Sequence, residues 1–282
     1  MKHIKTLLSG ILLSACIITL AGCKGGAESY LNKGNEYLAQ EDYGMALSCF
    51  LIANELSGGN NPVCQLNIGN CYDGEGEYEQ AVVWYSKSAE QGNAEAQFLL
   101  GCCYHVGSGV TENKETAVYW YSKSAEQGNA EAQYILGYCY ESGLGVTENK
   151  ETAVYWYSKS AEQGNAEAQS QLAYCYENGE GVAVDEQTAV YWYRKAAEQG
   201  IAWSQYRLGL CYDSGEGVAE DKETAVYWYR KAAEQGHAEA QNQLAYCYEI
   251  GKGVAEDKEM AAYWRRKAAE NDELLEIVRR DR

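Results

Sequence analysis

A motif of 36 residues recurs along most of this chain and limits what the chain can fold into. The motif reads NAEAQYILGYCYESGLGVTENKETAVYWYSKSAEQG over Asn129–Gly164. Thr111–Gln133 and Thr147–Gln169 are identical over 23 residues. The tryptophan of the motif recurs every 36 residues, at Trp120, Trp156, Trp192, Trp228 and Trp264. A fixed period of this length is typical of stacked-repeat proteins, in which each unit packs on its neighbours.

Each repeat is predicted to form one helix (helix A), a loop and a second helix (helix B). Small and apolar residues recur at helical spacing in both halves and give each helix one packing face. In the third repeat, these residues are Ala132, Leu136, Cys139 and Tyr140 in helix A, and Ala153, Trp156, Tyr157, Ser160 and Ala161 in helix B.

Capping residues indicate where the predicted helices begin and end. Gly143 and Gly164 suit left-handed C-caps of helices A and B. Asn149 suits an N-cap of helix B. Gly137 lies inside helix A, where glycine costs about 1 kcal/mol against alanine, so we expect another helix to approach closely there. The other repeats have equivalent N-caps at Asp185, Asp221 and Asp257, and alanine in place of Gly137 at Ala173 and Ala245.

The first 22 residues have the order of an export signal. Lys2 and Lys5 precede a largely apolar stretch, Leu7–Leu20, that is too short to span a membrane. The LAGC ending at Cys23 resembles the bacterial lipobox, which implies cleavage after Gly22 and attachment of palmitate and other acyl chains to Cys23. The alternatives are an ordinary cleaved signal or an uncleaved anchor. The lipobox predicts a lipid-anchored protein of the bacterial cell envelope, with the outer membrane or periplasm favoured over the inner membrane.

The remaining chain divides into four predicted parts. Residues 23–29 form a tether, and residues 30–60 form a helix pair that is similar to a tetratricopeptide repeat and serves as the N-terminal cap. Pro62 suits the first position of a new helix. Residues 61–272 hold six repeats, of which the first is four residues shorter, and residues 273–282 form a C-terminal cap.

The residues that recur in each repeat of this chain resemble the motif of a known family. The pattern L-G/A-x-C-Y-x-x-G-x-G-V-x-x-D/N-x-x-T-A-V-Y-W-Y-x-K-A/S-A-E-Q-G looks like the Sel1-like repeat, a relative of the tetratricopeptide repeat with a longer loop, over Asn61–Asp272. The departures are the short first repeat and Arg265, which stands where the third repeat has Tyr157. The resemblance implies an all-α fold, a right-handed α-solenoid or superhelix of antiparallel helix pairs whose A helices line the concave face.

The cysteines predict buried packing residues better than a disulfide framework. Six of the eleven occupy equivalent positions in successive A helices: Cys71, Cys103, Cys139, Cys175, Cys211 and Cys247. Packed helix axes lie about 8–10 Å apart, whereas bridged Cα atoms lie within about 7 Å. Cys49 and Cys64 are the only pair that we consider for a disulfide.

The sequence favours binding over catalysis. Cys102 and His105 offer too few ligands for a metal site. Apart from His3 in the signal segment, His237 is the only other histidine, so neither metal, cofactor nor catalytic triad is predicted. The S-x-x-K motif of β-lactamases is absent from the part of the chain after the signal. The net charge of -18 disfavours nucleic acid and anionic lipid surfaces and is compatible with a basic or neutral partner; the alternative is that the charge only keeps a long solenoid soluble.

One stripe of helix A varies while the packing positions repeat. It lies at positions i, i+3, i+7 and i+10 and carries tyrosine, tryptophan and carboxylate side chains, which suit peptide or sugar recognition. The alternative is that these aromatic residues pack between neighbouring A helices. The predicted partner-binding residues are Tyr134, Tyr138, Glu141, Tyr174, Glu177, Trp203, Tyr206, Leu210, Asp213 and Tyr246.

These observations predict a non-enzymatic scaffold at the bacterial envelope that binds a protein, a basic peptide or peptidoglycan on its concave face. A cell-wall enzyme of β-lactamase type is one alternative, because some proteins of the resembled family have been linked to such activity. A surface factor that engages host proteins is another.

Overall fold

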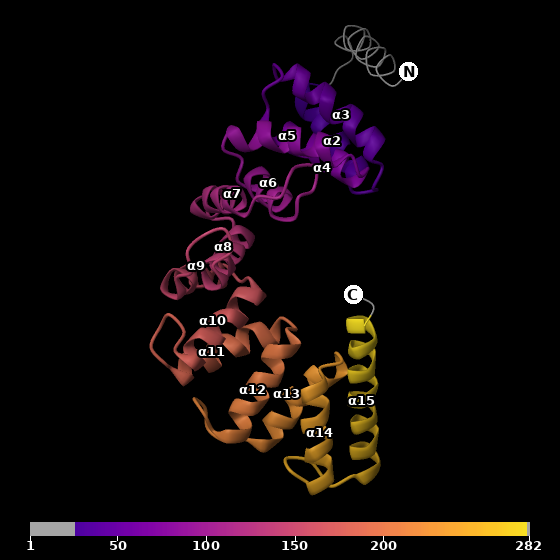
Figure 1. Ribbon diagram of the computed structural model, residues 1–282. Helices are drawn as coiled ribbons and strands as arrows, with labels where there is room; N and C mark the ends of the chain where they lie inside the picture. Colours follow the sequence, from indigo (N-terminus) through magenta and orange to yellow (C-terminus); the bar gives the residue numbers. More distant parts are fainter. Residues whose placement is uncertain (1–25, 281–282) are drawn as a thin grey trace. The chain divides into compact units, whose positions relative to one another are not determined.

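The computed structural model describes residues 26–280 of the chain, with side chains described as far as residue 271. The predicted signal peptide and Cys23 lie outside the described residues. The described part is all-α, with fourteen helices and no strand, as the sequence predicts (Figure 1). The helices are α2 (Ala27–Leu38), α3 (Tyr43–Leu56), α4 (Pro62–Gly74), α5 (Tyr78–Glu90), α6 (Ala94–Val106), α7 (Lys114–Glu126), α8 (Ala130–Ser142), α9 (Lys150–Glu162), α10 (Ala166–Asn178), α11 (Glu186–Glu198), α12 (Ala202–Ser214), α13 (Lys222–Glu234), α14 (Ala238–Ile250) and α15 (Lys258–Arg280).

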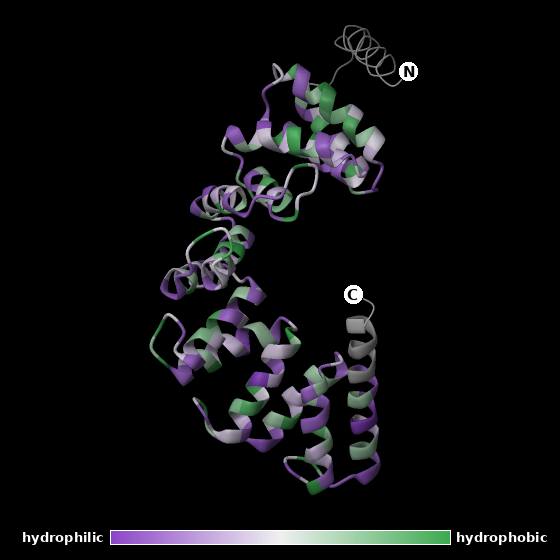
Figure 2. Ribbon diagram, viewed as in Figure 1, coloured by the Kyte–Doolittle hydropathy of each residue, from purple (hydrophilic) through white to green (hydrophobic). Residues whose placement is uncertain are grey.

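The helices belong to two compact units, which are described separately. The first unit contains α2–α7 and ends at Asn129, and the second contains α8–α15 and begins at Ala130. Even-numbered helices are the A helices and odd-numbered helices are the B helices. Within each unit, every helix A packs on the helix B that follows it, and that helix B packs on the next helix A. Each helix mixes hydrophobic and hydrophilic residues, because one side packs and the other meets solvent (Figure 2).

Side-chain caps begin the helices where the sequence predicts them. The side chain of Asn149 accepts a hydrogen bond from the Thr152 N–H at 2.9 Å, which satisfies a backbone donor that has no partner inside the helix. The predicted N-caps of the later B helices accept in the same way at 2.9–3.0 Å: Asp185, Asp221 and Asp257.

The two glycines of each loop have different roles. Gly143 ends α8 with φ of 70°, as predicted for a left-handed cap. Gly181, the second glycine of its loop, allows close contact with the preceding repeat. A Cβ on Gly181 would lie 2.2 Å from the carbonyl oxygen of Lys150, so the loop between α10 and α11 packs directly on the first turn of α9. The same contact recurs at Gly217 and Gly253.

A buried tyrosine of helix B fills the space above the helix A glycine. Tyr157 is fully buried, and its ring lies where a side chain of Gly137 would be, since a Cβ there would come within 2.7 Å of the ring. The predicted close approach at Gly137 is therefore confirmed. Gly101 and Gly209 make the same contact with Tyr121 and Tyr229.

Buried glutamines connect consecutive helices, a role that the sequence analysis missed. Gln205 on α12 is 5% exposed and donates from Nε2 to the carbonyl oxygen of Ala197 on α11, at 3.0 Å. Its Oε1 accepts from Gln235 Nε2 on α13, at 2.8 Å. One amide therefore links helices B, A and B in sequence. The same arrangement joins Gln169 to Ala161 and Gln199, and Gln241 to Ala233 and Asn271.

Both ends of the repeat region differ from the predicted division. The N-terminal helix α2 begins at Ala27 and so includes the end of the predicted tether, because Glu28 in the first turn interacts favourably with the helix dipole. The predicted separate cap at 273–282 is instead the continuation of α15 as far as Arg280. Asp272 stands where earlier repeats have a glycine with positive φ, so the residue that ends the other B helices is missing. No helix in the described part is long and apolar enough to span a bilayer.

The glutamine links predict a measurable loss of stability when one is removed. Gln205→Ala deletes one buried and one half-buried hydrogen bond and leaves the carbonyl oxygen of Ala197 without its side-chain donor, so we expect the free energy of unfolding to fall by about 1–3 kcal/mol. Urea denaturation followed by circular dichroism measures the change. Gln187→Ala, at an exposed position of α11, is the matched control and should shift stability by less than about 0.5 kcal/mol. Equal midpoints for the two variants would contradict the role of these links.

Candidate functional site

The ten predicted partner-binding residues lie on one face of α8, α10, α12 and α14 in the second unit, which we call the A-helix face. Tyr138 and Tyr246 are 44% and 45% exposed. The other eight are half-buried: Tyr134, Glu141, Tyr174, Glu177, Trp203, Tyr206, Leu210 and Asp213. The predicted residues therefore share one side of each of these A helices, and most of them are also partly packed.

Carboxylates near the ends of α8, α10 and α12 accept a hydrogen bond from the buried tyrosine of the following helix B. Tyr157 donates its hydroxyl proton to Glu141 at 2.8 Å, and Tyr193 donates to Glu177 at 2.8 Å. Burial raises the pKa of both tyrosines well above the usual range, so they remain protonated donors. Glu141 and Glu177 were predicted to contact a partner, but in this structure they also satisfy hydroxyl groups that would otherwise be buried without an acceptor.

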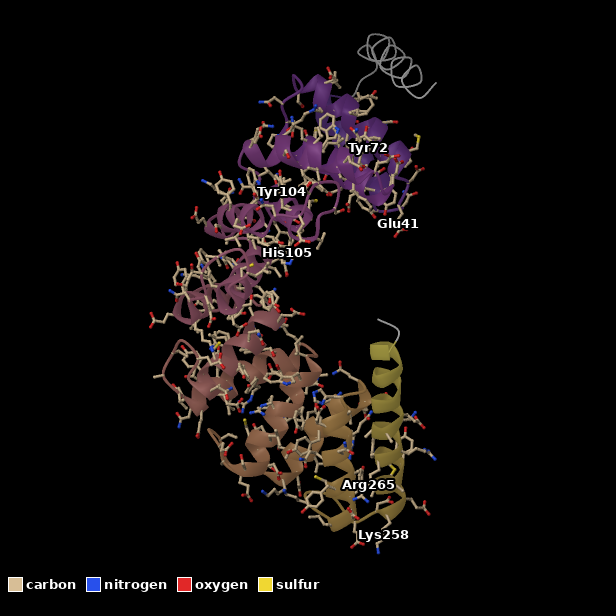
Figure 3. The ribbon with its side chains drawn as sticks, in the orientation of Figure 1. Glu41, Tyr72, Tyr104, His105, Lys258 and Arg265 are labelled. Carbon is tan, nitrogen blue, oxygen red and sulfur yellow. The ribbon has the colours of Figure 1, made fainter. Side chains whose placement is uncertain are left out.

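The last repeat replaces this hydrogen bond with an ion pair. Arg265, labelled in Figure 3 on α15, stands where the other repeats have the buried tyrosine and pairs with Glu249. Both side chains are substantially exposed. Arg265 thus preserves an interaction with the carboxylate at the end of helix A, although the last repeat lacks the buried aromatic ring.

Trp203 is packed within an aromatic cluster. Its ring centroid lies 5.9 Å from that of Tyr174 and 5.5 Å from that of Tyr193, the latter in an edge-to-face arrangement. The guanidinium of Arg207 lies 5.7 Å from the Trp203 ring and pairs with Glu177 of the previous repeat. Here the alternative from the sequence analysis, that aromatic residues pack between neighbouring A helices, applies to Trp203 and Tyr174.

Tyr206 stacks on His237, which begins α14. The two ring centroids lie 4.9 Å apart at 29°, and Nδ1 of His237 accepts from the Ala240 N–H at 3.4 Å. Burial lowers the pKa of His237, although Glu239 opposes the shift. The equivalent helices α6 and α10 begin with asparagine caps, Asn93 and Asn165.

Asp213 is the most strongly compensated carboxylate of the face. Lys252 lies 2.8 Å and Lys222 3.3 Å from its Oδ1, and the Tyr229 hydroxyl donates to Oδ2 at 3.4 Å. Lys252 comes from the loop of the next repeat, and nothing in its local sequence indicates this contact. Asp213 therefore contributes little free negative charge to the face.

The described cysteines are unbridged, and most are buried. Cys49 and Cys64, the pair considered for a disulfide, are both buried free thiols. Burial is the main cause that raises the pKa of Cys175 to about 12 and that of Cys211 to about 11, so these thiols stay protonated and unreactive at neutral pH. Within the described residues, no group of three or more histidine, cysteine and acidic side chains is arranged to hold a metal ion.

Comparison with known proteins identifies the repeats. The Sel1 repeat model matches six successive segments, residues 62–93, 94–129, 130–165, 166–201, 204–237 and 238–273. The chain belongs to the Sel1 repeat family. Sel1 repeat proteins generally act as protein–protein interaction scaffolds, and the Sel1 solenoid is typically non-enzymatic.

Two crystal structures of Sel1 repeat proteins are similar to this chain. A protective antigen of uropathogenic Escherichia coli strains shares 36% identity at a TM-score of 0.80, over 86% of this chain and 54% of that chain. This chain thus spans about half the length of that antigen. A Sel1 repeat protein from Oxalobacter formigenes shares 40% identity at a TM-score of 0.68, over 73% of this chain and 82% of that chain. No functionally curated protein matches the chain.

The half-buried His237 predicts a pH-dependent stability that one substitution removes. Because the folded state lowers the pKa of His237 below its usual value of 6.5, the unfolded chain takes up the proton first as the pH falls. The contribution of His237 to the free energy of unfolding is therefore fully present above about pH 6.5 and is lost as the pH falls below that value. His237→Asn introduces the cap of the other repeats and should be more stable than the parent at about pH 5.5, with a smaller difference at about pH 8.

Urea midpoints of the parent and the variant at the two pH values measure this difference. His105 also has a lowered pKa, through burial and the nearby Lys114, but it is present in both proteins and its contribution cancels. A stability difference that is the same at both pH values would contradict a role for protonation of His237.

Proposed function

We propose that this protein is a non-enzymatic scaffold of the bacterial envelope and that the A-helix face of its second unit binds a protein partner. The observation that carries the proposal is the variation between repeats on this face. Positions that pack each helix pair repeat almost unchanged, whereas the position of Tyr134 holds Ser170, Tyr206 and Asn242 in the following repeats. A surface that differs at each step suits a partner whose own side chains differ along its length.

The charge of the A-helix face favours a basic segment of that partner. The most exposed acidic side chains of the stripe are Glu131, Glu167 and Glu239, at its first position, although Asn165 donates to Glu131 and His237 lies 3.3 Å from Glu239. Glu141, Glu177 and Asp213 are less available, since tyrosine hydroxyls, Arg207 and two lysines already contact them. Exposed tyrosines beside exposed carboxylates suit lysine and arginine side chains, which combine a charged group with an apolar stem.

Absence of catalysis is part of the proposal. His105 belongs to the first unit and His237 to the second, and the described thiols with shifted pKa values are shifted toward the unreactive form. A cell-wall enzyme of β-lactamase type is the alternative. Turnover of a chromogenic β-lactam by the purified chain, abolished by a substitution on the A-helix face, would overturn the scaffold proposal.

The exposed tyrosines of the A-helix face give the sharpest test of partner binding. We expect Tyr138→Ser/Tyr246→Ser to fold normally and to weaken binding of the partner by about tenfold or more, because both side chains contribute contact area and neither is needed in the core. The partner is captured by crosslinking from envelopes and its affinity is then measured with the purified chains. Trp203→Ala is a poorer test, since Trp203 packs against Tyr193.

The matched control is Tyr155→Ser/Tyr227→Ser, which removes two tyrosines of similar exposure, 53% and 51%, from helices B. Binding should also weaken as salt is raised if carboxylates contribute. Affinity that is equal in the two double variants would rule out the A-helix face as the partner site.

Envelope anchoring through Cys23 is tested independently. We expect metabolic labelling with a fatty-acid analogue to mark the chain, with all label lost in Cys23→Ala, since two or more acyl chains at this residue would hold the protein to the membrane. Cys16→Ala, in the preceding signal segment, is the control and should keep the label. Label that persists in Cys23→Ala would contradict the lipid anchor.

A further inference from the structure

One aromatic residue of the motif is repeated although the core does not need it. The first tyrosine of the A-V-Y-W-Y segment lies about 200° around helix B from the buried tyrosine two residues later, so the two cannot share a face. Its side chain is half-exposed in every complete repeat: 53% at Tyr119 and Tyr155, 52% at Tyr191, 51% at Tyr227 and 39% at Tyr263. Packing of the helix pairs therefore does not explain why the residue recurs.

The exposed tyrosine has the same surroundings in successive repeats of the second unit. Its ring lies edge-to-face against the next tryptophan, with centroids 5.0 Å apart for Tyr155 and Trp156 and 4.9 Å apart for Tyr191 and Trp192. A lysine one turn later lies 5.8–5.9 Å from the ring centre, at Lys159, Lys195 and Lys231. Each repeat therefore presents the same small arrangement of a phenol, an indole and an ammonium group.

These arrangements border grooves that repeat with the sequence. The groove between α11 and α13 has a volume of about 510 Å³ and is lined by Glu198, Gln205, Tyr227, Trp228, Lys231 and Gln235, among others. The groove between α13 and α15 has a volume of about 390 Å³ and is lined by the equivalents 36 residues later, Glu234, Gln241, Tyr263, Trp264, Lys267 and Asn271. The second groove is thus the first one repeated along the chain.

One residue that lines the second groove has a buried donor without an acceptor. Trp264 is 8% exposed, and its Nε1–H is buried with no hydrogen-bond partner among the described residues. A buried donor of this kind costs free energy unless an acceptor reaches it. The ammonium of Lys267 lines the same groove and can donate to the hydroxyl and ring oxygens of a polar ligand. Asn271 donates to Gly236 and Gln241, so only its side-chain oxygen is left, as an acceptor for a ligand hydroxyl.

The grooves carry little net charge, in contrast to the chain as a whole. The first is lined by Glu198, Glu234 and Lys231 and the second by Glu234 and Lys267, so neither groove has more than one uncancelled charge, whereas the whole chain has a net charge of -18. Such a surface does not select a ligand by its charge. Half-exposed aromatic rings with neighbouring amide, carboxylate and ammonium groups suit a ligand that has apolar C–H faces and many hydroxyl groups.

We infer that the grooves along the B helices of the second unit, the B-helix face, form a series of equivalent subsites for a neutral polysaccharide. Each pyranose ring stacks a C–H face on an exposed tyrosine, while its hydroxyl groups bond to the lysine, glutamate and amide side chains of the groove. Identical subsites at regular intervals match a ligand made of identical units. A protein partner has a different side chain at each step and matches the varying A-helix face instead.

Titration with cellohexaose and chitohexaose, followed by calorimetry, tests this inference on the purified chain. We expect saturable binding of at least one hexasaccharide, and binding of glucose or N-acetylglucosamine that is about tenfold or more weaker, because a single ring occupies one subsite. Tyr191→Ser/Tyr227→Ser should weaken hexasaccharide binding by about tenfold or more without lowering the thermal midpoint appreciably. The matched control, Tyr138→Ser/Tyr246→Ser on the A-helix face, should bind as the parent does.

Other outcomes overturn the inference. Absence of saturable binding to both hexasaccharides, or the same loss in the two double variants, shows that the B-helix face is not a polysaccharide site. A large drop in thermal midpoint for Tyr191→Ser/Tyr227→Ser, with unchanged affinity, assigns these tyrosines to packing. A protein that binds the parent and is lost only in this variant makes the B-helix face a protein surface, and the inference is then wrong while the proposed role of the A-helix face is unaffected.

Discussion

The contact between a tyrosine ring and a helix backbone determines how each repeat is built. The ring of Tyr157 lies so close to helix A that a Cβ on Gly137 would be 2.7 Å away. This contact sets the separation of the two helices and buries the ring completely. It also carries the hydroxyl group across helix A, where Glu141 accepts its hydrogen bond. A core constraint thereby fixes the position of a carboxylate on the A-helix face.

Polar side chains then connect one repeat to the next. The amide of Gln205 bonds to α11 and α13, and Gly181 lets its loop meet the backbone of α9. Buried amides are stabilising only when each donor and acceptor is paired, so these links specify one arrangement of neighbouring helices more strictly than apolar packing alone does. Apolar side chains therefore stabilise each helix pair, and polar links stabilise the packing of one pair on the next.

This division leaves two surfaces with opposite character in the second unit. On the A-helix face several side chains differ between repeats, and exposed acids lie at Glu167 and Glu239. On the B-helix face the exposed tyrosine, the lysine and the glutamate recur and their charges cancel. A varied acidic surface suits one particular protein partner, whereas a uniform neutral surface suits a polymer of like units. One Sel1 repeat unit can thus offer two kinds of binding surface, because its two helices expose different residues.

The sequence alone determined the all-α repeat fold, its period and most helix ends, since these follow from local properties: the spacing of apolar residues, the caps at Asn149 and Asp185, and the glycine at 143. It also placed the varying stripe on a single face, because position along a helix fixes direction. Only the tertiary structure decided what each stripe residue contacts. Lys252 reaches Asp213 across 39 residues of sequence, and Trp203 packs on Tyr174, 29 residues before it. Such contacts depend on how one repeat is rotated against the next, which the motif of a single repeat does not contain.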